Sequence, residues 1–89
     1  MSHTPIDIYL RPTCPFCYRA EKLLKKKGLQ YRVLDVTGDD ALFAEMVERA
    51  KGGRTVPQIF AGDRHLGGCD ELMALEAAGE LDAIVHSAA

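Results

Sequence analysis

The chain has 89 residues, of which 47% are hydrophobic, and a formal net charge of -2. This length fits a single small domain, residues 1–89, and the acidic balance argues against a nucleic-acid-binding protein. No run approaches the ~20 apolar residues of a membrane span, and the N-terminal stretch lacks the basic start and apolar run of a signal peptide, so we expect a cytoplasmic protein without membrane association.

The first elements expected along the chain are a strand and a helix. Residues 6–10 (IDIYL) alternate, with apolar side chains sharing one face, which indicates a strand. Apolar side chains recur at helical spacing over residues 15–27, where Pro15 suits the first turn and Gly28 suits the stop. The basic residues of this helix lie mostly on its other side. The run Lys25–Lys27 predicts a solvated helix end that favours the dipole and can attract acidic partners.

A second strand and a second helix follow. Residues 31–36 (YRVLDV) are rich in β-branched and aromatic side chains, and apolar residues on both faces predict an interior strand of a covered sheet. Asp39 or Asp40 can cap a helix that runs to Ala50. Its buried stripe is predicted to contain Leu42, Phe43, Met46, Val47 and Ala50.

The rest of the chain predicts a hairpin and two helical pieces. Residues 57–61 (PQIFA) and 64–66 (RHL) indicate short strands around a Gly-Asp turn. A third helix is expected from about Asp70, and a short helical piece follows Gly79. The predicted contact positions are Leu72, Met73 and Leu75 or Glu76 in the third helix, and Leu81, Ile84 and Val85 in the last piece.

The order of the elements, β-α-β-α-β-β-α, is typical of an α/β fold. The strand–helix–strand start implies a parallel pair with a right-handed crossover. The hairpin adds antiparallel strands, so we expect a four-stranded mixed sheet covered by helices.

Two of the three cysteines, Cys14 and Cys17, form a CPFC motif where the first strand passes into the first helix. Residues three apart share a helix face, about 5–6 Å apart at Cβ, which allows a disulfide with small adjustment. The free N–H groups and the dipole of the helix start stabilise a thiolate at Cys14. Cys17 lies inside the first turn and should be less exposed, so we expect Cys14 to attack and Cys17 to resolve.

The cysteine pair has two alternative interpretations. Cys14, Cys17, His65 and Cys69 are formally a four-ligand zinc set. A structural zinc site of this kind usually has paired knuckles, whereas this chain has one CxxC, so we expect no metal. A permanent disulfide would close a very short loop, which contributes least in the chain-entropy account.

Three motifs together resemble a known family. "CPFC" follows the first strand, "TVP" precedes the third strand and "GGCDEL" follows the hairpin. In this order and spacing the chain resembles the glutaredoxins, in particular small bacterial dithiol glutaredoxins of the glutaredoxin 3 type, from about Ile6 to Val85. The resemblance implies a thioredoxin fold and a glutathione-dependent thiol–disulfide oxidoreductase that reduces glutathione mixed disulfides and protein disulfides.

The resemblance also implies a glutathione site around the CPFC motif. Pro57 is similar to the family's cis-proline, beside which the backbone of Val56 can pair with an extended peptide. The N–H groups of Cys69 and Asp70 would hold the γ-glutamyl carboxylate, and the Asp70 side chain would meet the ammonium. Asp70 is also expected to act as a plain helix N-cap, and the two roles are compatible.

The glycyl carboxylate of glutathione needs cations at the other end of this site. Arg11 and Arg54 are the candidates that the resemblance favours, with Arg49 or Lys51 as weaker ones. The full set implied to bind glutathione is Arg11, Thr13, Phe16, Arg54, Thr55, Val56, Pro57, Gly68, Cys69 and Asp70.

The resemblance makes glutathione a co-substrate and implies no tightly bound cofactor. The expected partners are glutathione and glutathionylated or disulfide-containing proteins, among them ribonucleotide reductase, and we expect a monomer. One alternative is a redoxin served by thioredoxin reductase. Another is an iron–sulfur carrier in which two chains share a cluster through Cys14 and two glutathiones. Such monothiol relatives usually have CGFS, so Pro15 and Cys17 argue against the carrier.

Overall fold

A four-stranded mixed sheet in the order β2-β1-β3-β4 forms the centre of the computed structural model, which describes residues 3–86. β1 pairs with β2 in parallel and with β3 antiparallel, and β3 and β4 form the predicted hairpin. The strands are β1 (Ile6–Leu10), β2 (Tyr31–Asp35), β3 (Gln58–Ala61) and β4 (Arg64–Gly67). The mixed topology predicted from the order of the elements is confirmed.

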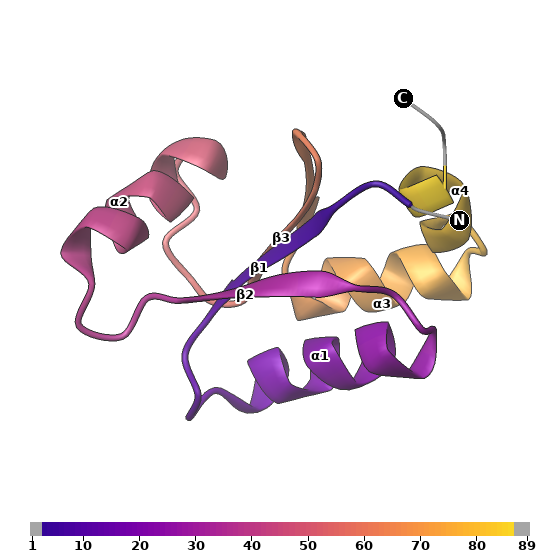
Figure 1. Cartoon of the computed structure of the whole chain (residues 1–89), viewed down its shortest axis with the longest axis horizontal. Helices are drawn as coiled ribbons and strands as arrows, with labels where there is room; N and C mark the ends of the chain where they lie inside the picture. Colours follow the sequence, from indigo (N-terminus) through magenta and orange to yellow (C-terminus); the bar gives the residue numbers. More distant parts are fainter. Residues whose placement is uncertain (1–2, 87–89) are drawn as a thin grey trace.

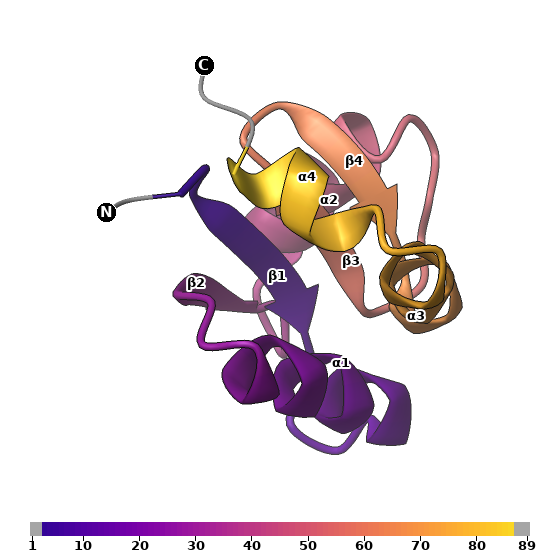
Figure 2. The same ribbon diagram turned by 90° about the vertical axis from the view of Figure 1, so that its right-hand side faces the viewer.

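Helices cover both faces of this sheet (Figure 1). The helices are α1 (Pro15–Lys26), α2 (Asp40–Arg49), α3 (Cys69–Ala77) and α4 (Leu81–His86). Figure 2 shows α1, α3 and α4 on one side of the strands, with α2 behind them on the other. None of the helices formed within residues 3–86 has the length and apolar character that crossing a membrane requires.

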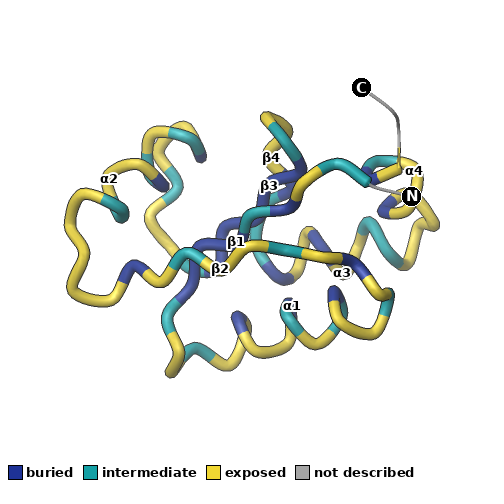
Figure 3. The backbone as a smooth tube through the Cα atoms, viewed as in Figure 1, coloured by how far each residue is buried: buried dark blue, intermediate teal, exposed yellow. Residues whose placement is uncertain are grey.

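The two faces of the sheet carry two hydrophobic clusters. The larger one joins alternate side chains of β1, such as Ile6 and Ile8, to the buried faces of α1, α3 and α4. The smaller one packs Tyr9 and Phe60 of the opposite face against Met46 of α2. In Figure 3 the buried positions gather along β1 and β3, because these central strands are covered on both faces.

The last helix completes the larger cluster. Leu81 and Val85 of α4 are fully buried. The Val85 carbonyl accepts a hydrogen bond of 2.7 Å from the N–H of Thr4, which lies just before β1. The segment that precedes the first strand is therefore joined directly to the last helix.

Two expectations about burial are wrong. β2 is an edge strand rather than an interior one, since it pairs only with β1, and Val33 at its centre is 45% exposed. The apolar residues on both of its faces did not indicate a second neighbouring strand. Met73, expected at a contact position of α3, is 36% exposed, because α3 turns the face that carries Leu72 toward the core.

The basic end of α1 also differs from the expectation of a solvated end. The Lys27 ammonium lies 2.8 Å from Glu76 of α3 and 3.1 Å from Asp82 of α4, and its side chain is only 13% exposed. The hydrogen bonds to Glu76 and then Asp82 raise the pKa of Lys27. Lys27 therefore links three helices, whereas Lys25 and Lys26 remain exposed.

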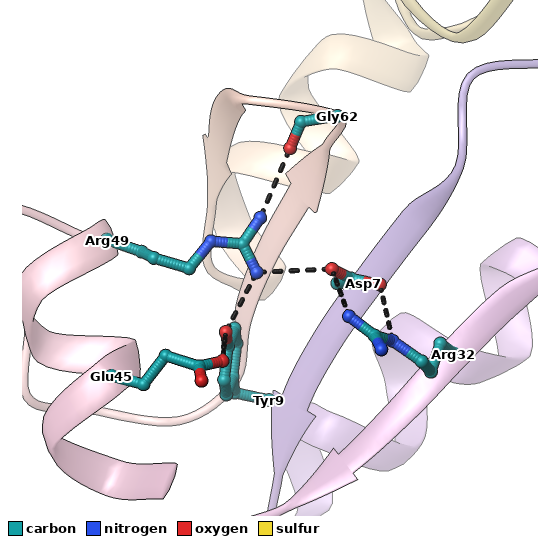
Figure 4. A network of polar contacts seen from close by, with 6 residues as sticks. All are labelled: Asp7, Tyr9, Arg32, Glu45, Arg49 and Gly62. Atoms are coloured by element: carbon teal, nitrogen blue, oxygen red, sulfur yellow. Dashed lines mark hydrogen bonds and ion pairs between the residues drawn. The ribbon is translucent and has the colours of Figure 1, made fainter.

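A polar network fastens α2 to the sheet (Figure 4). The Arg49 guanidinium donates to Asp7 of β1 at 3.1 Å, to the Tyr9 hydroxyl at 2.8 Å and to the Gly62 carbonyl at 3.2 Å. Arg32 of β2 binds the same Asp7 carboxylate through two hydrogen bonds of 3.0 Å. The Tyr9 hydroxyl donates to Glu45 of α2. Because these hydrogen bonds occupy the Arg49 guanidinium, we do not include Arg49 in a glutathione site.

Candidate active site

Cys14 lies in the turn that joins β1 to α1. Its N–H donates to the Arg11 carbonyl at 3.1 Å, and its extended backbone makes it the N-cap of the helix. Its Sγ accepts a hydrogen bond of 3.2 Å from the N–H of Cys17 and lies 3.7 Å from the carbonyl oxygen of Val56. The N–H contact favours a negative charge on the sulfur, as expected for a nucleophile at a helix start.

Cys17 lies in a different environment from Cys14. It is 2% exposed, whereas Cys14 is half-buried, which confirms the expected difference in exposure. Burial, and after it the hydrogen bond to Cys14, raises the pKa of Cys17 to about 12. At neutral pH one thiol of the pair is thus accessible and the other is buried and protonated.

The loop before β3 lies beside this turn. The Val56–Pro57 peptide bond is cis, as the resemblance implied, and Pro57 is buried. The Pro57 carbonyl would lie 3.2 Å from a Cβ on Gly68, so the loop and the start of α3 approach closely. A glycine at position 68 permits this approach.

The start of α3 presents backbone N–H groups near the same loop. Gly68, not Asp70, is the N-cap, so the N-cap role expected for Asp70 is wrong. The Asp70 side chain is exposed. Glu71 accepts a hydrogen bond of 2.8 Å from the Gly68 N–H, which leaves the N–H groups of Cys69 and Asp70 at the helix terminus. Sequence reasoning missed Glu71, although a glutamate three residues after an N-cap is a recognisable signal.

Gly67 has a specific reason to be glycine. Its φ is +101°, and a Cβ there would lie 2.7 Å from Cβ of Glu71. A side chain at this position would displace the residue that organises the helix start.

Arg11 and Arg54 come together on one aromatic ring. Their guanidinium carbons lie 5.5 Å and 5.6 Å from the centroid of Phe43, a residue of α2. Cation–π contacts of this length orient the half-buried Arg11 and the exposed Arg54 without neutralising them. Sequence reasoning placed Phe43 only in the buried stripe of its helix, because periodicity does not show what the outer edge of a ring contacts.

The remaining candidates are close in sequence to Cys14 or to Val56. Thr13 and Phe16 are exposed. The guanidinium carbon of Arg19 lies 5.6 Å from the centroid of the Phe16 ring. Thr55 is exposed, and its carbonyl accepts a hydrogen bond of 2.9 Å from the buried Gln58 side chain. Gln58 thereby holds the loop in place from inside the sheet.

The third thiol, Cys69, is 5% exposed. Burial, followed by the charge of Asp70, raises its pKa, so it stays a thiol at neutral pH.

The zinc alternative needs His65 close to the cysteines. The ring of His65 instead stacks on Phe60 at 4.7 Å and shares a 2.6 Å hydrogen bond with Gln58. Within residues 3–86 no three potential ligands gather as a metal site.

Three clefts compete as locations for the site. One, of about 820 Å³, lies at the start of β1 and β2, and its lining contains none of the cysteines. Another, of about 470 Å³, lies between Thr55 and Gly68 and also contains no cysteine. A groove of about 470 Å³ includes Cys14 and runs onto α1. This groove is the candidate site, because it contains the accessible thiol.

Comparisons with known proteins point to one family over most of the chain. Residues 6–66 match the family model described as Glutaredoxin. The chain is 49% identical to a probable glutaredoxin of Synechocystis sp. over 92% of this chain and 93% of that protein. It is 46% identical to glutaredoxin 3 of Escherichia coli strain K12 over 90% of this chain and 95% of that one.

Solved structures share the fold. A glutaredoxin from Brucella melitensis, 46% identical, superposes with a TM-score of 0.84 and covers 98% of this chain and 94% of its own. A buckwheat glutaredoxin in complex with glutathione, 29% identical, superposes with a TM-score of 0.82 over 93% of this chain and 76% of that one.

Proposed function

The chain belongs to the glutaredoxin family of thiol–disulfide oxidoreductases, and we propose that it works with glutathione, reducing glutathione mixed disulfides and protein disulfides through Cys14 and Cys17. The observation that carries this proposal is the unequal cysteine pair. Cys14 accepts an N–H hydrogen bond at a helix start, while Cys17, 2% exposed, is held as a buried thiol.

With a glutathionylated substrate the reaction is a two-step exchange. The Cys14 thiolate attacks the glutathione sulfur, the mixed disulfide breaks, and the substrate leaves as a thiolate that takes a proton. A second glutathione thiolate then attacks the glutathione sulfur bound to Cys14. Oxidised glutathione leaves and the Cys14 thiolate is restored without Cys17.

With a protein disulfide both cysteines act. Cys14 attacks one sulfur of the substrate disulfide and forms a mixed disulfide with it, while the other substrate sulfur leaves as a thiolate. Cys17 attacks Sγ of Cys14, and its proton passes to the substrate thiolate that leaves, so the reduced substrate is released. Two glutathiones then reduce the Cys14–Cys17 disulfide and become oxidised glutathione, so the electrons balance.

The proposed glutathione site uses both ends of the tripeptide. The cysteinyl backbone pairs with Val56, and the γ-glutamyl carboxylate lies on the N–H groups of Cys69 and Asp70. The glycyl carboxylate lies between Arg11 and Arg54, which share one ring and so approach a single anion together. The buckwheat structure, which contains glutathione, supports this assignment through its similar fold.

The test is a coupled assay with glutathione, glutathione reductase and NADPH on a small glutathione mixed disulfide. A parallel assay replaces the glutathione system with thioredoxin reductase. We expect turnover only with glutathione. Turnover only with thioredoxin reductase would refute glutathione dependence and favour the redoxin alternative.

A further inference from the structure

The solvent-facing side of α1 carries four cations in a row. Arg19, Lys22, Lys25 and Lys26 are exposed. The ion pairs found within residues 3–86 involve Lys27, Arg32 and Arg49 instead. The four side chains of α1 are thus unpaired with acids, although the whole chain has a formal net charge of -2.

A groove connects these cations to the reactive sulfur. The groove of about 470 Å³ at Cys14 is lined by Tyr18, Arg19 and Lys22 along its helical side. A smaller hollow of about 160 Å³ continues from Tyr18 and Lys22 to Lys25. Because the two share Tyr18 and Lys22 as lining residues, they adjoin each other, and we call them together the α1 groove. Cys14 lies at one end of it.

The α1 groove contains Cys14 and shares Thr13 with the predicted glutathione set, but it extends away from the rest of that set. Val56, Gly68 and Asp70 do not line it, and neither do the two arginines that share the Phe43 ring. Glutathione and a second molecule can therefore approach Cys14 from different sides. The remainder of a substrate whose sulfur is at Cys14 can extend into the α1 groove.

We propose that the α1 groove docks an acidic segment of a protein substrate, adjacent in sequence to the cysteine that Cys14 attacks. This inference rests on the proposed function, since it names a partner of the same thiol. Three groove cations, Arg19, Lys22 and Lys25, follow one another at intervals of three residues. Tyr18, 66% exposed, offers an apolar surface beside them.

The dimensions of the groove set the length of the segment. Residues 18–25 of a helix span roughly 10 Å, which is the length of about three residues of extended chain. Glu21 lines the hollow but is engaged with the Tyr31 hydroxyl at 2.9 Å. Acidic side chains at two or three positions next to the substrate cysteine thus face an excess of positive charge.

The experiment measures kcat/KM for short peptides that contain an internal CxxC disulfide. Each peptide carries three test residues next to one cysteine, and these are all acidic, all neutral amides or all lysines. In one set of peptides the three residues precede the disulfide, and in a second set they follow it. Glutathione, glutathione reductase and NADPH supply the electrons. At low ionic strength we expect an acidic peptide to exceed its neutral counterpart by about fivefold, and the lysine peptide to fall below it.

Charge variants of the full chain locate the effect. Lys22→Glu should remove the preference for acidic peptides. Arg64→Glu changes the net charge equally but lies at the far end of the sheet, where it pairs with Ala61, and should keep the preference. The preference should also decline at about 0.5 M salt, where screening is strong.

Several outcomes would overturn the proposal. Equal kcat/KM for acidic and neutral peptides would do so, as would an unchanged preference in Lys22→Glu and Lys22→Gln, or an equal loss in Arg64→Glu. Competition by a short oligonucleotide as strong as that by the free acidic peptide would exclude selectivity for protein segments. Absence of glutathione-dependent turnover on the small mixed disulfide is a separate result, which refutes the proposed function.

Discussion

At the scale of single residues, one sequence motif produces two thiols of opposite character. Cys14 is the N-cap, where backbone N–H groups meet its sulfur, whereas Cys17 points into the core beside Ala20 and Leu24. The motif indicated this difference, because position in the first helical turn determines which cysteine faces the core. The third thiol, Cys69, is buried by its place at the start of α3.

Serine substitutions should separate the two proposed reactions. Cys14→Ser should lose both activities by at least about 10³-fold, because no other accessible thiolate is available. Cys17→Ser should retain reduction of a glutathione mixed disulfide and lose reduction of protein disulfides. The coupled assay with each substrate measures this. Retained protein-disulfide reduction in Cys17→Ser would contradict the resolving role.

Alkylation should also distinguish the three thiols. At about pH 8 the native, reduced chain should take up one iodoacetamide label rapidly, at Cys14. A pKa of about 12 leaves roughly one Cys17 in 10⁴ as thiolate at that pH, and burial hinders access. Raising the pH to about 9 should still leave Cys17 unlabelled.

Mass spectrometry with peptide mapping identifies the labelled residue. The same chain in urea should take up three labels, one for each cysteine. Equal labelling rates for Cys14 and Cys17 in the native chain would disprove the difference in environment.

At the scale of secondary-structure elements, α2 contributes to the proposed site although it carries no reacting group. Its Phe43 ring contacts both Arg11 from the turn after β1 and Arg54 from the loop before β3. Two elements far apart in sequence are thus brought together by a third.

Replacing this ring should weaken glutathione binding without changing the chemistry. We expect Phe43→Leu to raise KM for glutathione about two- to fivefold, the equivalent of one cation–π contact of roughly 0.5–1 kcal/mol, while kcat stays the same. Phe43→Tyr keeps an aromatic ring and is the matched control. Steady-state kinetics with varied glutathione measure the effect, and an unchanged KM in Phe43→Leu would contradict it.

Periodicity and turn residues were sufficient to locate the helices and strands. The change from alternation in residues 6–10 to helical spacing after Pro15 was clear, and the Gly-Asp turn predicted the hairpin. The place of β2 at the sheet edge was not predictable, because apolar residues on two faces do not show which strands pair. The contacts of Lys27 and Phe43 were missed for a similar reason, since they depend on helices that meet only in the folded chain.

At the scale of the whole molecule, the Asp7 network joins both edges of the structure on the α2 side. It connects β1, β2, α2 and the turn between β3 and β4 (Figure 4). Burial alone would raise the pKa of Asp7, but the hydrogen bonds from Arg32 and Arg49 outweigh it, and the pKa lies below its usual value. The folded state therefore favours the ionised carboxylate.

Removing this charge should destabilise the fold in a pH-dependent way. We expect Asp7→Asn to lower the free energy of unfolding by about 1–2 kcal/mol at pH 7, a value kept small because the side chains are partly solvated. Because the pKa of Asp7 is lower in the folded chain, its ionised carboxylate stabilises the fold at pH values above the pKa of the unfolded chain. This stabilisation is lost as the pH falls through the pKa of the folded chain. The difference between the two proteins should thus shrink toward pH 3. Urea unfolding followed by circular dichroism measures it, and a constant difference would contradict the assignment.

The hydrogen bond between Thr4 and Val85 has a consequence for the order of events during translation. The ribosome synthesises Cys14 and Cys17 when only the first strand and helix exist, before the loop at Val56 has been made. The larger core is completed only when Leu81 and Val85 emerge and pack behind β1. The nascent chain thus carries its dithiol through most of its synthesis without the surroundings that make the two sulfurs unequal.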